Sequence, residues 1–248
     1  MNRGYGRQIL NDLPLGKIVE NTASAKPPGR KGYKGRYVNL HPVDPQGDIE
    51  DLYRNSHGTE ENNRIWTYMA YGPFSDATAM KEWLIDCKAS NDPLFLTVTS
   101  TDLNQCAGVV SFLNIVPRMR TLELGNIWYS SIVHHTKTNT ETIYLMLSEA
   151  FDVLNYRRVE WKCDALNARS RRAALRLGFS FEGIFRQHYI IKGRNRDTAW
   201  FAMLDRDWPA IKMVKQPNNR PKVNNYPLIP YIRNENRPII TKNGSALI

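Results

Sequence analysis

The sequence has few cysteines and no long apolar run. Its 248 residues include only Cys87, Cys106 and Cys163, which are far apart and lie in apolar segments. An odd number at such spacing supports neither a disulfide framework nor a zinc site, so we expect reduced, buried thiols and no bound metal. No run of about 18 apolar residues occurs, and the N-terminus lacks the apolar segment of a signal peptide. We therefore expect a soluble, cytoplasmic protein.

Acidic residues are scarce at both ends of the chain. The sequence carries 34 Lys and Arg against 24 Asp and Glu, a formal net charge of +10. The excess lies in residues 1–36 and 212–248, whereas residues 37–211 are nearly neutral, which excludes a general basic coat for nucleic acid. Eleven basic residues nevertheless gather between Arg157 and Arg196. This concentration predicts one local site for an anion.

Both ends also lack hydrophobic periodicity. We expect residues 1–33 to form a flexible basic N-terminal arm and residues 212–248 a Pro/Asn-rich basic C-terminal arm. The YPLIPYI stretch at 226–232 could dock on the domain or on a partner as an extended segment. Residues 34–211 between the arms predict one domain.

Strand and helix patterns follow one another within this domain. The order is strand, helices, three strands, helix, strand, helix and two strands, which predicts an α/β (α+β) fold with a central mixed, mostly antiparallel sheet of six to seven strands. The expected helices are 48–56, 75–88 with Ser75 as N-cap, 140–154 and 167–178; the expected strands are 35–43, 93–100, 105–116, 120–130, 157–165 and two in 179–204. Lys192–Asn195 would join the last two strands, with Gly193 and Asn195 at positive φ.

The segment SIVHHTKTNTET, residues 131–142, leads into one of these helices. Small hydroxylated residues at a helix start, where backbone N–H groups are unpaired, make a natural phosphate cradle. The simpler alternative is that Thr138 or Thr140 caps the helix. The His134-His135 pair could serve as metal ligands or as loop donors, and without a carboxylate cluster at ligand spacing we favour donors. The candidate phosphate donors are therefore His134, Thr136, Lys137, Thr138, Asn139 and Thr140.

A second unusual segment is NARSRRAALRLGFSFEG, residues 167–183. Asn167 as N-cap and Gly178 as left-handed C-cap explain its ends. Exposed arginines are usually solvated surface, but next to the first loop they indicate an anion. Ser170 with Arg171 or Arg172 would face the groove beside the strand end.

Several short sequence motifs occur together and in a fixed order in residues 167–208. They are Asn-x-x-Ser, Leu-Gly-Phe, Glu-Gly, a Gly-containing hairpin and Asp-x-x-Trp, here Asn167, Ser170, Leu177-Gly178-Phe179, Glu182-Gly183, Gly193, and Asp197 with Trp200. This combination resembles the GNAT superfamily of acetyl-CoA-dependent N-acetyltransferases, in particular the branch that includes the ribosomal-protein alanine N-acetyltransferases. The likeness covers about residues 34–211.

The resemblance implies a sheet with splayed central strands that admit the pantetheine arm of acetyl-CoA, and a pyrophosphate on the N-terminus of the long helix. It places Asn167 at the pantetheine or acetyl end, Ser170 near the thioester sulfur as proton donor, and Arg171 or Arg172 near the phosphates. A backbone N–H around Tyr129 to Ser131 would donate to the oxyanion.

The sequence departs from the superfamily pattern at two places. The usual phosphate loop carries glycines where this chain has Lys137 and Asn139, so backbone approach to a pyrophosphate is less free, and side-chain donors could compensate. A tyrosine that many members use as general acid is replaced by Ala174.

Acyl transfer to an amine needs a base, and Glu123 is the first candidate. We expect it on the strand face shared with Ile127 and Tyr129, partly desolvated and therefore with a raised pKa. The alternative is a surface glutamate, since charged strand residues usually face water. His188 and Tyr189 are the rival proton acceptors.

Acidic side chains near the expected mouth of the site could hold a cationic acceptor. Glu60 and Glu61 lie close in sequence to Trp66 and Tyr68, which could form an apolar wall.

Two functions remain open on the sequence alone. The first is acetyl transfer from acetyl-CoA to a protein N-terminus, a lysine or a small amine, by a monomer or dimer without membrane contact. The second is a catalytically silent protein of the same fold that binds RNA or ribosomes through its basic arms.

Overall fold

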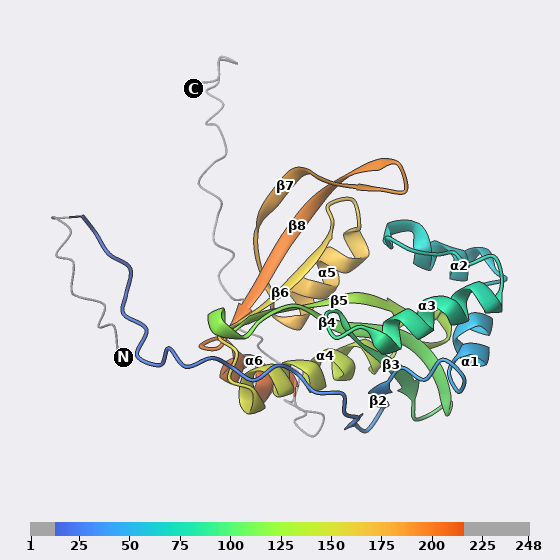
Figure 1. Ribbon diagram of the computed structural model, residues 1–248, viewed down its shortest axis with the longest axis horizontal. Helices are drawn as coiled ribbons and strands as arrows, with labels where there is room; N and C mark the ends of the chain where they lie inside the picture. Colours follow the sequence, from blue (N-terminus) through green and yellow to red (C-terminus); the bar gives the residue numbers. More distant parts are fainter. Residues whose placement is uncertain (1–12, 216–248) are drawn as a thin grey trace, which may run out of the picture.

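The computed structural model describes residues 13–215, which fold around one sheet of eight strands in the order β1-β2-β3-β4-β5-β6-β8-β7 (Figure 1). All neighbouring strands pair antiparallel except β5 and β6, which confirms the mixed, mostly antiparallel sheet. The strand beyond the expected seven is the two-residue β1. The strands are Tyr33–Lys34 (β1), Val38–Pro42 (β2), Leu94–Ser100 (β3), Gln105–Val116 (β4), Thr121–Tyr129 (β5), Arg158–Asp164 (β6), Ser180–Ile191 (β7) and Arg194–Leu204 (β8).

Helices connect these strands and differ from the sequence predictions mainly at their ends. The N-cap of α3 is Asp76 rather than Ser75, since the Asp76 side chain accepts a 2.9 Å hydrogen bond from the Ala79 N–H. The helix expected at 140–154 begins two residues earlier and closes with a π-helical turn. The helices are Ile49–Arg54 (α1), Glu60–Asn63 (α2), Ala77–Ala89 (α3), Thr138–Ser148 (α4), Ala168–Leu177 (α5) and Trp208–Lys215 (α6), with 3₁₀ turns at Arg64–Tyr68 (η1), Pro117–Met119 (η2) and Ser131–Val133 (η3) and the π-turn at Glu149–Val153 (η4).

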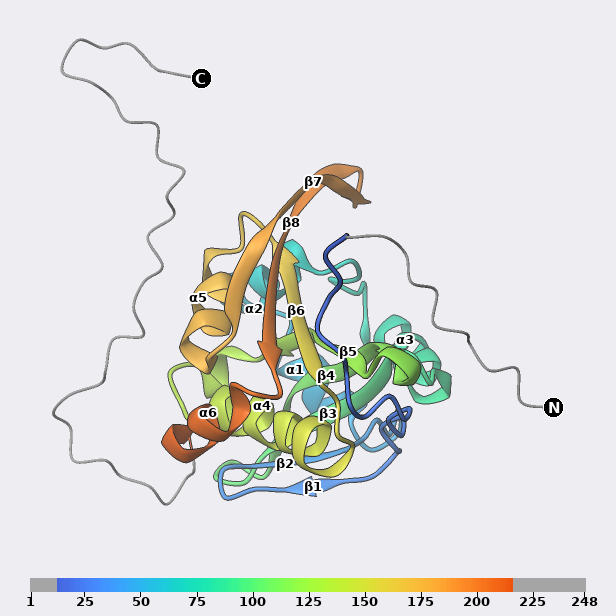
Figure 2. The same ribbon diagram turned by 90° about the vertical axis from the view of Figure 1, so that its left-hand side faces the viewer.

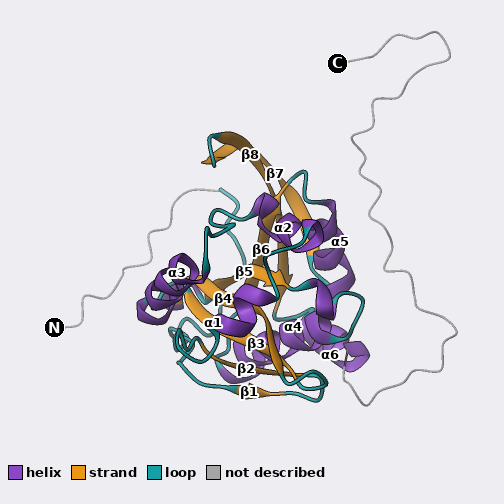
Figure 3. Ribbon diagram, turned by 90° about the vertical axis from the view of Figure 1, so that its right-hand side faces the viewer, coloured by secondary structure: helices purple, strands orange, loops and turns teal. Residues whose placement is uncertain are grey.

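Each face of the sheet buries its own apolar cluster. Helices α4, α5 and α6 lie on one side and α1 and α3 on the other (Figures 2 and 3). Phe112, Ile143 and Trp161 belong to the cluster under α4 and α5, whereas Trp66 and Met80 belong to the cluster under α3. The three cysteines are all buried and free, as the sequence indicates.

The central strands diverge. Strands β5 and β6 pair only at Thr121↔Arg158, Leu122↔Val159 and Glu123↔Glu160. Beyond this point β5 stays with β4, while β6 continues beside β8 and rises with the β7–β8 hairpin (Figure 1). The predicted splay of the central strands is therefore confirmed.

The turn of the β7–β8 hairpin is tighter than predicted. Lys192 and Gly193 form a two-residue loop with φ of 50° and 71°. Asn195 already belongs to β8 and pairs with Ile190, so the expectation of a positive φ there is wrong. Two residues at positive φ match the twist of the flanking strands.

Most of the two expected arms, including 226–232, lies outside the described residues, which exclude 1–12 and 216–248. The described part of the N-terminal segment lies against the domain: the Ala25 N–H donates to the Pro117 carbonyl at 3.0 Å, and Lys31 pairs with Glu149 at 2.9 Å. At the other end, α6 crosses the expected boundary before Lys212. No helix in the described part of the chain is long and apolar enough to span a membrane.

Candidate functional site

Where β5 and β6 diverge, their facing edges form no backbone hydrogen bonds with each other. Past Glu123 and Glu160, the backbone of β5 bonds only toward β4 and that of β6 only toward β8. Unpaired strand edges are templates for an added extended chain. The opening can therefore take an extended ligand that carries amide groups.

A bulge in β5 changes which residues face the opening. Asn126 has a φ of 51°, and the pairing with β4 shifts register between Val109 and Ser111. An extra residue reverses the side-chain alternation of a strand. Ile127 and Tyr129 consequently pack against the cluster that holds Leu122 and Leu124. The expectation that Glu123 shares a face with Ile127 and Tyr129 is therefore wrong.

The first turn of α4 has backbone N–H groups without hydrogen-bond acceptors in the described chain. Neither Thr138 nor Thr140 caps it: the N-cap is Lys137, which makes no side-chain cap bond. Thr136 Oγ1 instead accepts from the Thr138 N–H at 3.2 Å. No acceptor in residues 13–215 takes the N–H groups of Asn139 and Thr140. These donors and the positive end of the helix dipole suit an anion.

The loop before α4 leans on α2. Ser131 Oγ donates to Asn62 Oδ1 at 2.8 Å, and His134 Nδ1 lies 3.4 Å from Glu61 Oε1. These two candidate residues therefore already have protein partners.

A hollow of about 420 Å³ lies on the β2 side of this loop. Tyr37, His135 and Thr136 are among its lining residues. Lys137 also lines it and donates to the Tyr37 hydroxyl at 2.8 Å, so its ammonium points toward β2.

Helix α5 has the predicted caps. The Asn167 side chain accepts from the Ser170 N–H at 3.0 Å, and Gly178 has a φ of 104°. Ser170 Oγ accepts a 3.0 Å bond from the Trp161 indole N–H, which fixes the hydroxyl beside the open side of β6. Asn167 and Ser170 therefore lie together at the start of α5, near the opening.

The arginines of α5 point in different directions. Arg171 donates to the Ala165 carbonyl at 3.2 Å and lies against the Phe181 ring, and Arg172 is exposed. Arg176, in the last turn, instead donates to Thr140 Oγ1 at 2.8 Å. The structure thus brings Arg176 to the N-terminus of α4. The sequence carried no signal for this choice, because it depends on how the two helices pack.

Glu123 lies at the point where the strands separate, and only 5% of its surface is exposed. Its Oε2 accepts from Asn114 Nδ2 at 2.7 Å and from Lys162 Nζ at 2.8 Å. Lys162 also contacts Glu160 Oε2 at 2.9 Å. Burial raises the pKa of Glu123 above its ordinary value, against the opposing effect of Lys162.

The rival bases lie on β7. His188 packs on Tyr189 and near Trp200, and its Nδ1 is buried without a partner in the described chain. Burial, together with the charges of Arg196 and Lys162, lowers the pKa of His188. Tyr189 is about half exposed, with the guanidinium of Arg196 over its ring.

Hydrogen bonds hold the η1 segment to the β7–β8 hairpin on one side and to the β6–α5 loop on the other. Lys192 Nζ, at the hairpin tip, donates to the Trp66 carbonyl at 2.9 Å and also to the Gly72 carbonyl. The Tyr68 hydroxyl donates to the Leu166 carbonyl at 3.3 Å. Trp66 is 1% exposed and belongs to the core, so the expectation that it forms an apolar wall at a mouth is wrong.

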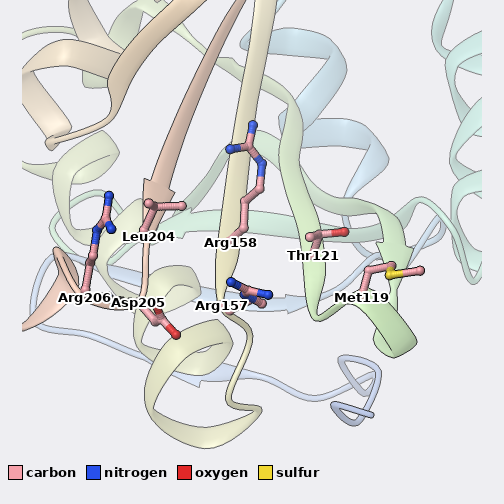
Figure 4. Close-up of a pocket in the computed structure, with 7 residues that line it drawn as sticks. All are labelled: Met119, Thr121, Arg157, Arg158, Leu204, Asp205 and Arg206. Carbon is pink, nitrogen blue, oxygen red and sulfur yellow. Dashed lines mark hydrogen bonds between the residues drawn. The ribbon is translucent and has the colours of Figure 1, made fainter. Parts of the chain in front are cut away.

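A second hollow, of about 370 Å³, lies at the paired end of β5 and β6 (Figure 4). Arg157, Arg158 and Arg206 line it with Thr121. Arg158 is already paired with Glu160 and Glu182, at 2.8 and 2.6 Å. The candidate site is therefore the open end of the splay.

Three possible metal ligands meet away from this site. His41, Asp48 and Cys106 place one ligand atom each within 4.8 Å of one another, which their sequence spacing does not indicate. Asp48 Oδ1 is 3.0 Å from His41 Nε2 and 3.7 Å from Cys106 Sγ. Burial and Asp48 raise the pKa of the Cys106 thiol to about 12. With the Cys106 thiol protonated, His41, Asp48 and Cys106 form a hydrogen-bonded network.

Comparison with known proteins places these features in context. The family model of the acetyltransferase (GNAT) domain matches residues 38–180. A GCN5-related N-acetyltransferase from Brucella melitensis is 37% identical, with a TM-score of 0.78 over 84% of this chain and 95% of that one. A GNAT-family protein from Chromobacterium violaceum is 35% identical, with a TM-score of 0.73 over 79% and 98%. No curated protein matches the chain.

A more distant structure shares the fold. The microcin C7 self-immunity acetyltransferase MccE, in complex with acetyl-CoA and AMP, is 23% identical, with a TM-score of 0.61 over 68% of this chain and 93% of that one.

Proposed function

The chain belongs to the GNAT acetyltransferase family, and from this premise we propose that it is an N-acetyltransferase that moves an acetyl group from acetyl-CoA to an amine by direct attack. One observation carries the proposal. The splay of β5 and β6 begins at a buried carboxylate, Glu123, and the same strand leads on to the unpaired N-terminus of α4. A ligand with an anionic end and an extended amide-bearing arm fits this arrangement.

The residues at α4 fit the pyrophosphate of acetyl-CoA. The N–H groups of Asn139 and Thr140 and the Arg176 guanidinium supply donors and positive charge. Asn139, like Lys137, stands at a position where the family's usual phosphate loop carries a glycine.

The residues at the opening fit the pantetheine arm and the acetyl group. The facing edges of β5 and β6 can pair with its amides, and Asn167 lies at the start of α5 beside them. The Ser130 N–H is already taken by the Ala107 carbonyl. Because N–H groups alternate along a strand, the Tyr129 N–H faces away from β4, and we assign it to the acyl oxygen.

Acetyl-CoA supplies the activated acyl group as a thioester: an N–C bond forms to the amine, the C–S bond breaks, and the leaving sulfur takes a proton. Glu123 removes the proton from the incoming ammonium, which must become neutral before it can attack. Ser170, oriented by Trp161, donates its hydroxyl proton to the sulfur and is reprotonated by the proton that the attacking nitrogen releases as the amide forms. Tyr189 and His188 are the alternative proton acceptors.

The acceptor can be a protein N-terminus, a lysine or a small amine. The resemblance to the ribosomal-protein alanine acetyltransferases makes a protein N-terminus the first acceptor to test. The alternative of a silent RNA- or ribosome-binding protein rests on the basic ends, most of which lie outside the described residues.

The test combines binding and turnover. Acetyl-CoA is titrated into the full chain by calorimetry, and release of free CoA thiol is then followed with peptides that begin in Ala or Ser, with a lysine-containing blocked peptide and with small amines. We expect micromolar binding and turnover with at least one acceptor class, with the product identified by mass spectrometry. A folded protein that binds no acetyl-CoA would overturn the proposal and favour the silent protein.

A further inference from the structure

An alternating row of charges runs along β6 to the point where the strands separate. Glu182 pairs with Arg158, Arg158 with Glu160, Glu160 with Lys162, and Lys162 with Glu123, at 2.6 to 2.9 Å. The row ends at the carboxylate that the proposed function uses as base. Lys162 is thus the only cation in the described chain that forms a salt bridge with Glu123.

Lys162 is held tightly in this position. Only 11% of its side chain is exposed, and its ammonium lies 3.9 Å from the centre of the Trp200 ring. An ammonium over an aromatic face is attracted by the ring, more strongly where water is excluded. Burial alone would lower the pKa of Lys162, but Glu123 and Glu160 raise it, so the residue stays a cation.

The two oxygens of Glu123 have different surroundings. Oε2 accepts from both Lys162 and Asn114, whereas no donor in the described residues contacts Oε1. Oε1 lies over Gly125, which follows on the diverging part of β5: a Cβ built on Gly125 would be 3.4 Å away. One oxygen is therefore anchored, and the other has no donor among residues 13–215 and lies beside the part of β5 that no longer pairs with β6.

We propose that Lys162 is a positioning residue for the reaction: its ammonium holds Glu123 as a carboxylate by Oε2, so that Oε1 is free to take the proton of the acceptor amine. This inference rests on the proposed function. Glu160 stands directly opposite Glu123 in the β5–β6 register. Without the cation, the buried carboxylate of Glu123 and the partly buried carboxylate of Glu160 would repel each other, and one would hold its proton at neutral pH.

Several polar and charged groups lie on the strands around Glu123. Strand β4 contributes the uncharged Asn114, and β6 contributes Glu160, Lys162 and Arg158. Strand β7 contributes Glu182, which is neutralised by Arg158, and His188; β8 contributes Arg196. Of these, Lys162 and Glu160 act most directly on Glu123, so their variants separate the two effects.

The experiment measures the ionisation of Glu123 and the pH profile of the enzyme. The full chain is compared with Lys162→Met, Lys162→Arg and Lys162→Met/Glu160→Gln, with Lys88→Met as an exposed control. The titration midpoint of the Glu123 carboxyl is read by ¹³C NMR and assigned with Glu123→Gln. The acid limb of kcat/KM is measured with two amines of different pKa. If the limb reports ionisation of the amine, its midpoint shifts with the pKa of the amine; if it reports Glu123, it does not.

We expect Lys162→Met to raise the Glu123 midpoint and the acid limb by about one pH unit or more. Lys162→Arg should stay near the wild type, and the added Glu160→Gln should return both values toward it. If Lys162→Met keeps its fold, by circular dichroism, and lowers kcat equally at every pH with an unmoved midpoint, Lys162 has only a structural role and the inference is overturned. Absence of turnover in the folded wild type would instead overturn the proposed function, and the inference with it.

Discussion

The guanidinium of Arg176, in the last turn of α5, donates a 2.8 Å hydrogen bond to Oγ1 of Thr140 in the first turn of α4. A positive charge therefore stands beside the helix end whose dipole already favours an anion. Arg171 and Arg172, five and four residues earlier, do not make this contact in the structure. The geometry makes Arg176 the arginine that we expect near the phosphates of acetyl-CoA.

The first prediction is that Arg176→Met weakens acetyl-CoA binding about tenfold, as loss of one charge-assisted contact does. Calorimetric titration at two salt concentrations measures it, and the difference from wild type should shrink at high salt. Arg172→Met is the matched control, because Arg172 is exposed on the same helix. A larger loss with Arg172→Met would return the assignment to the arginine expected from sequence.

The second prediction concerns the proposed base. Glu123→Gln keeps the shape of the side chain but cannot accept the proton, so kcat should fall by about 10² to 10⁴. Burial raises the pKa of Glu123 above 4.5, so on acidification the carboxylate is lost at a higher pH than for an ordinary glutamate. The wild-type rate should therefore fall with decreasing pH along a limb that Glu123→Gln lacks.

The matched control for this prediction is Glu50→Gln on α1, whose carboxylate is 88% exposed. It should leave both kcat and the acid limb at wild-type values. A Glu123→Gln variant with a normal rate would shift the role of base to His188 or Tyr189.

Features decided within a few residues were predictable from sequence. The caps of α5, Asn167 and Gly178, appear as expected, because capping depends on side chains within one turn. The order of the main strands and helices was predictable because each element buries one periodic face.

Features decided by contacts between distant segments were not predictable. The bulge at Asn126 depends on how β5 pairs with β4, and it reverses the faces of Ile127 and Tyr129. Trp66 lies close in sequence to Glu60 and Glu61, yet it fills the core under α3. In the sequence, nothing distinguishes Lys162 from the other basic residues between Arg157 and Arg196. It reaches Glu123 because β5 and β6 pair in parallel with Glu123 opposite Glu160.

The third prediction addresses the tie between Lys192 and the η1 segment. Lys192→Met removes a donor to the carbonyls of Trp66 and Gly72. The Trp66 carbonyl keeps the Met69 N–H, at 3.3 Å, whereas no other donor to the Gly72 carbonyl is seen in the described chain. Residues 64–74 should then open more often, which raises amide hydrogen exchange there. Because this segment lies between the hairpin tip and the β6–α5 loop, we expect a rise in KM for the acceptor of a few-fold, with little change in acetyl-CoA affinity.

Hydrogen exchange by mass spectrometry and a KM-against-kcat comparison measure this effect. Arg194→Met, at the exposed hairpin tip, is the control and should change neither. Unchanged exchange in residues 64–74 of Lys192→Met would show that the tie does not hold the segment.

The fourth prediction concerns Glu141, a buried carboxylate that holds the β1–β2 turn against α4. Its oxygens accept from the N–H groups of Arg36, Tyr37 and Val38 at 2.9, 2.6 and 2.9 Å. Glu141→Ala would leave these donors without their acceptor in a site that is 5% exposed. Since a hydrogen bond to a charged group contributes about 1.5–3 kcal/mol and the three are not additive, we expect a loss of roughly 3 kcal/mol in the free energy of unfolding.

Urea unfolding measures this loss as a lower midpoint at unchanged slope. Glu82→Ala, on the exposed side of α3, should leave the midpoint within about 0.5 kcal/mol of wild type. The effect should also reach the site, because Tyr37 in this turn accepts from Lys137 at the start of α4. A Glu141→Ala variant as stable as wild type would mean that water replaces the carboxylate, and the turn would then not depend on α4 for its position.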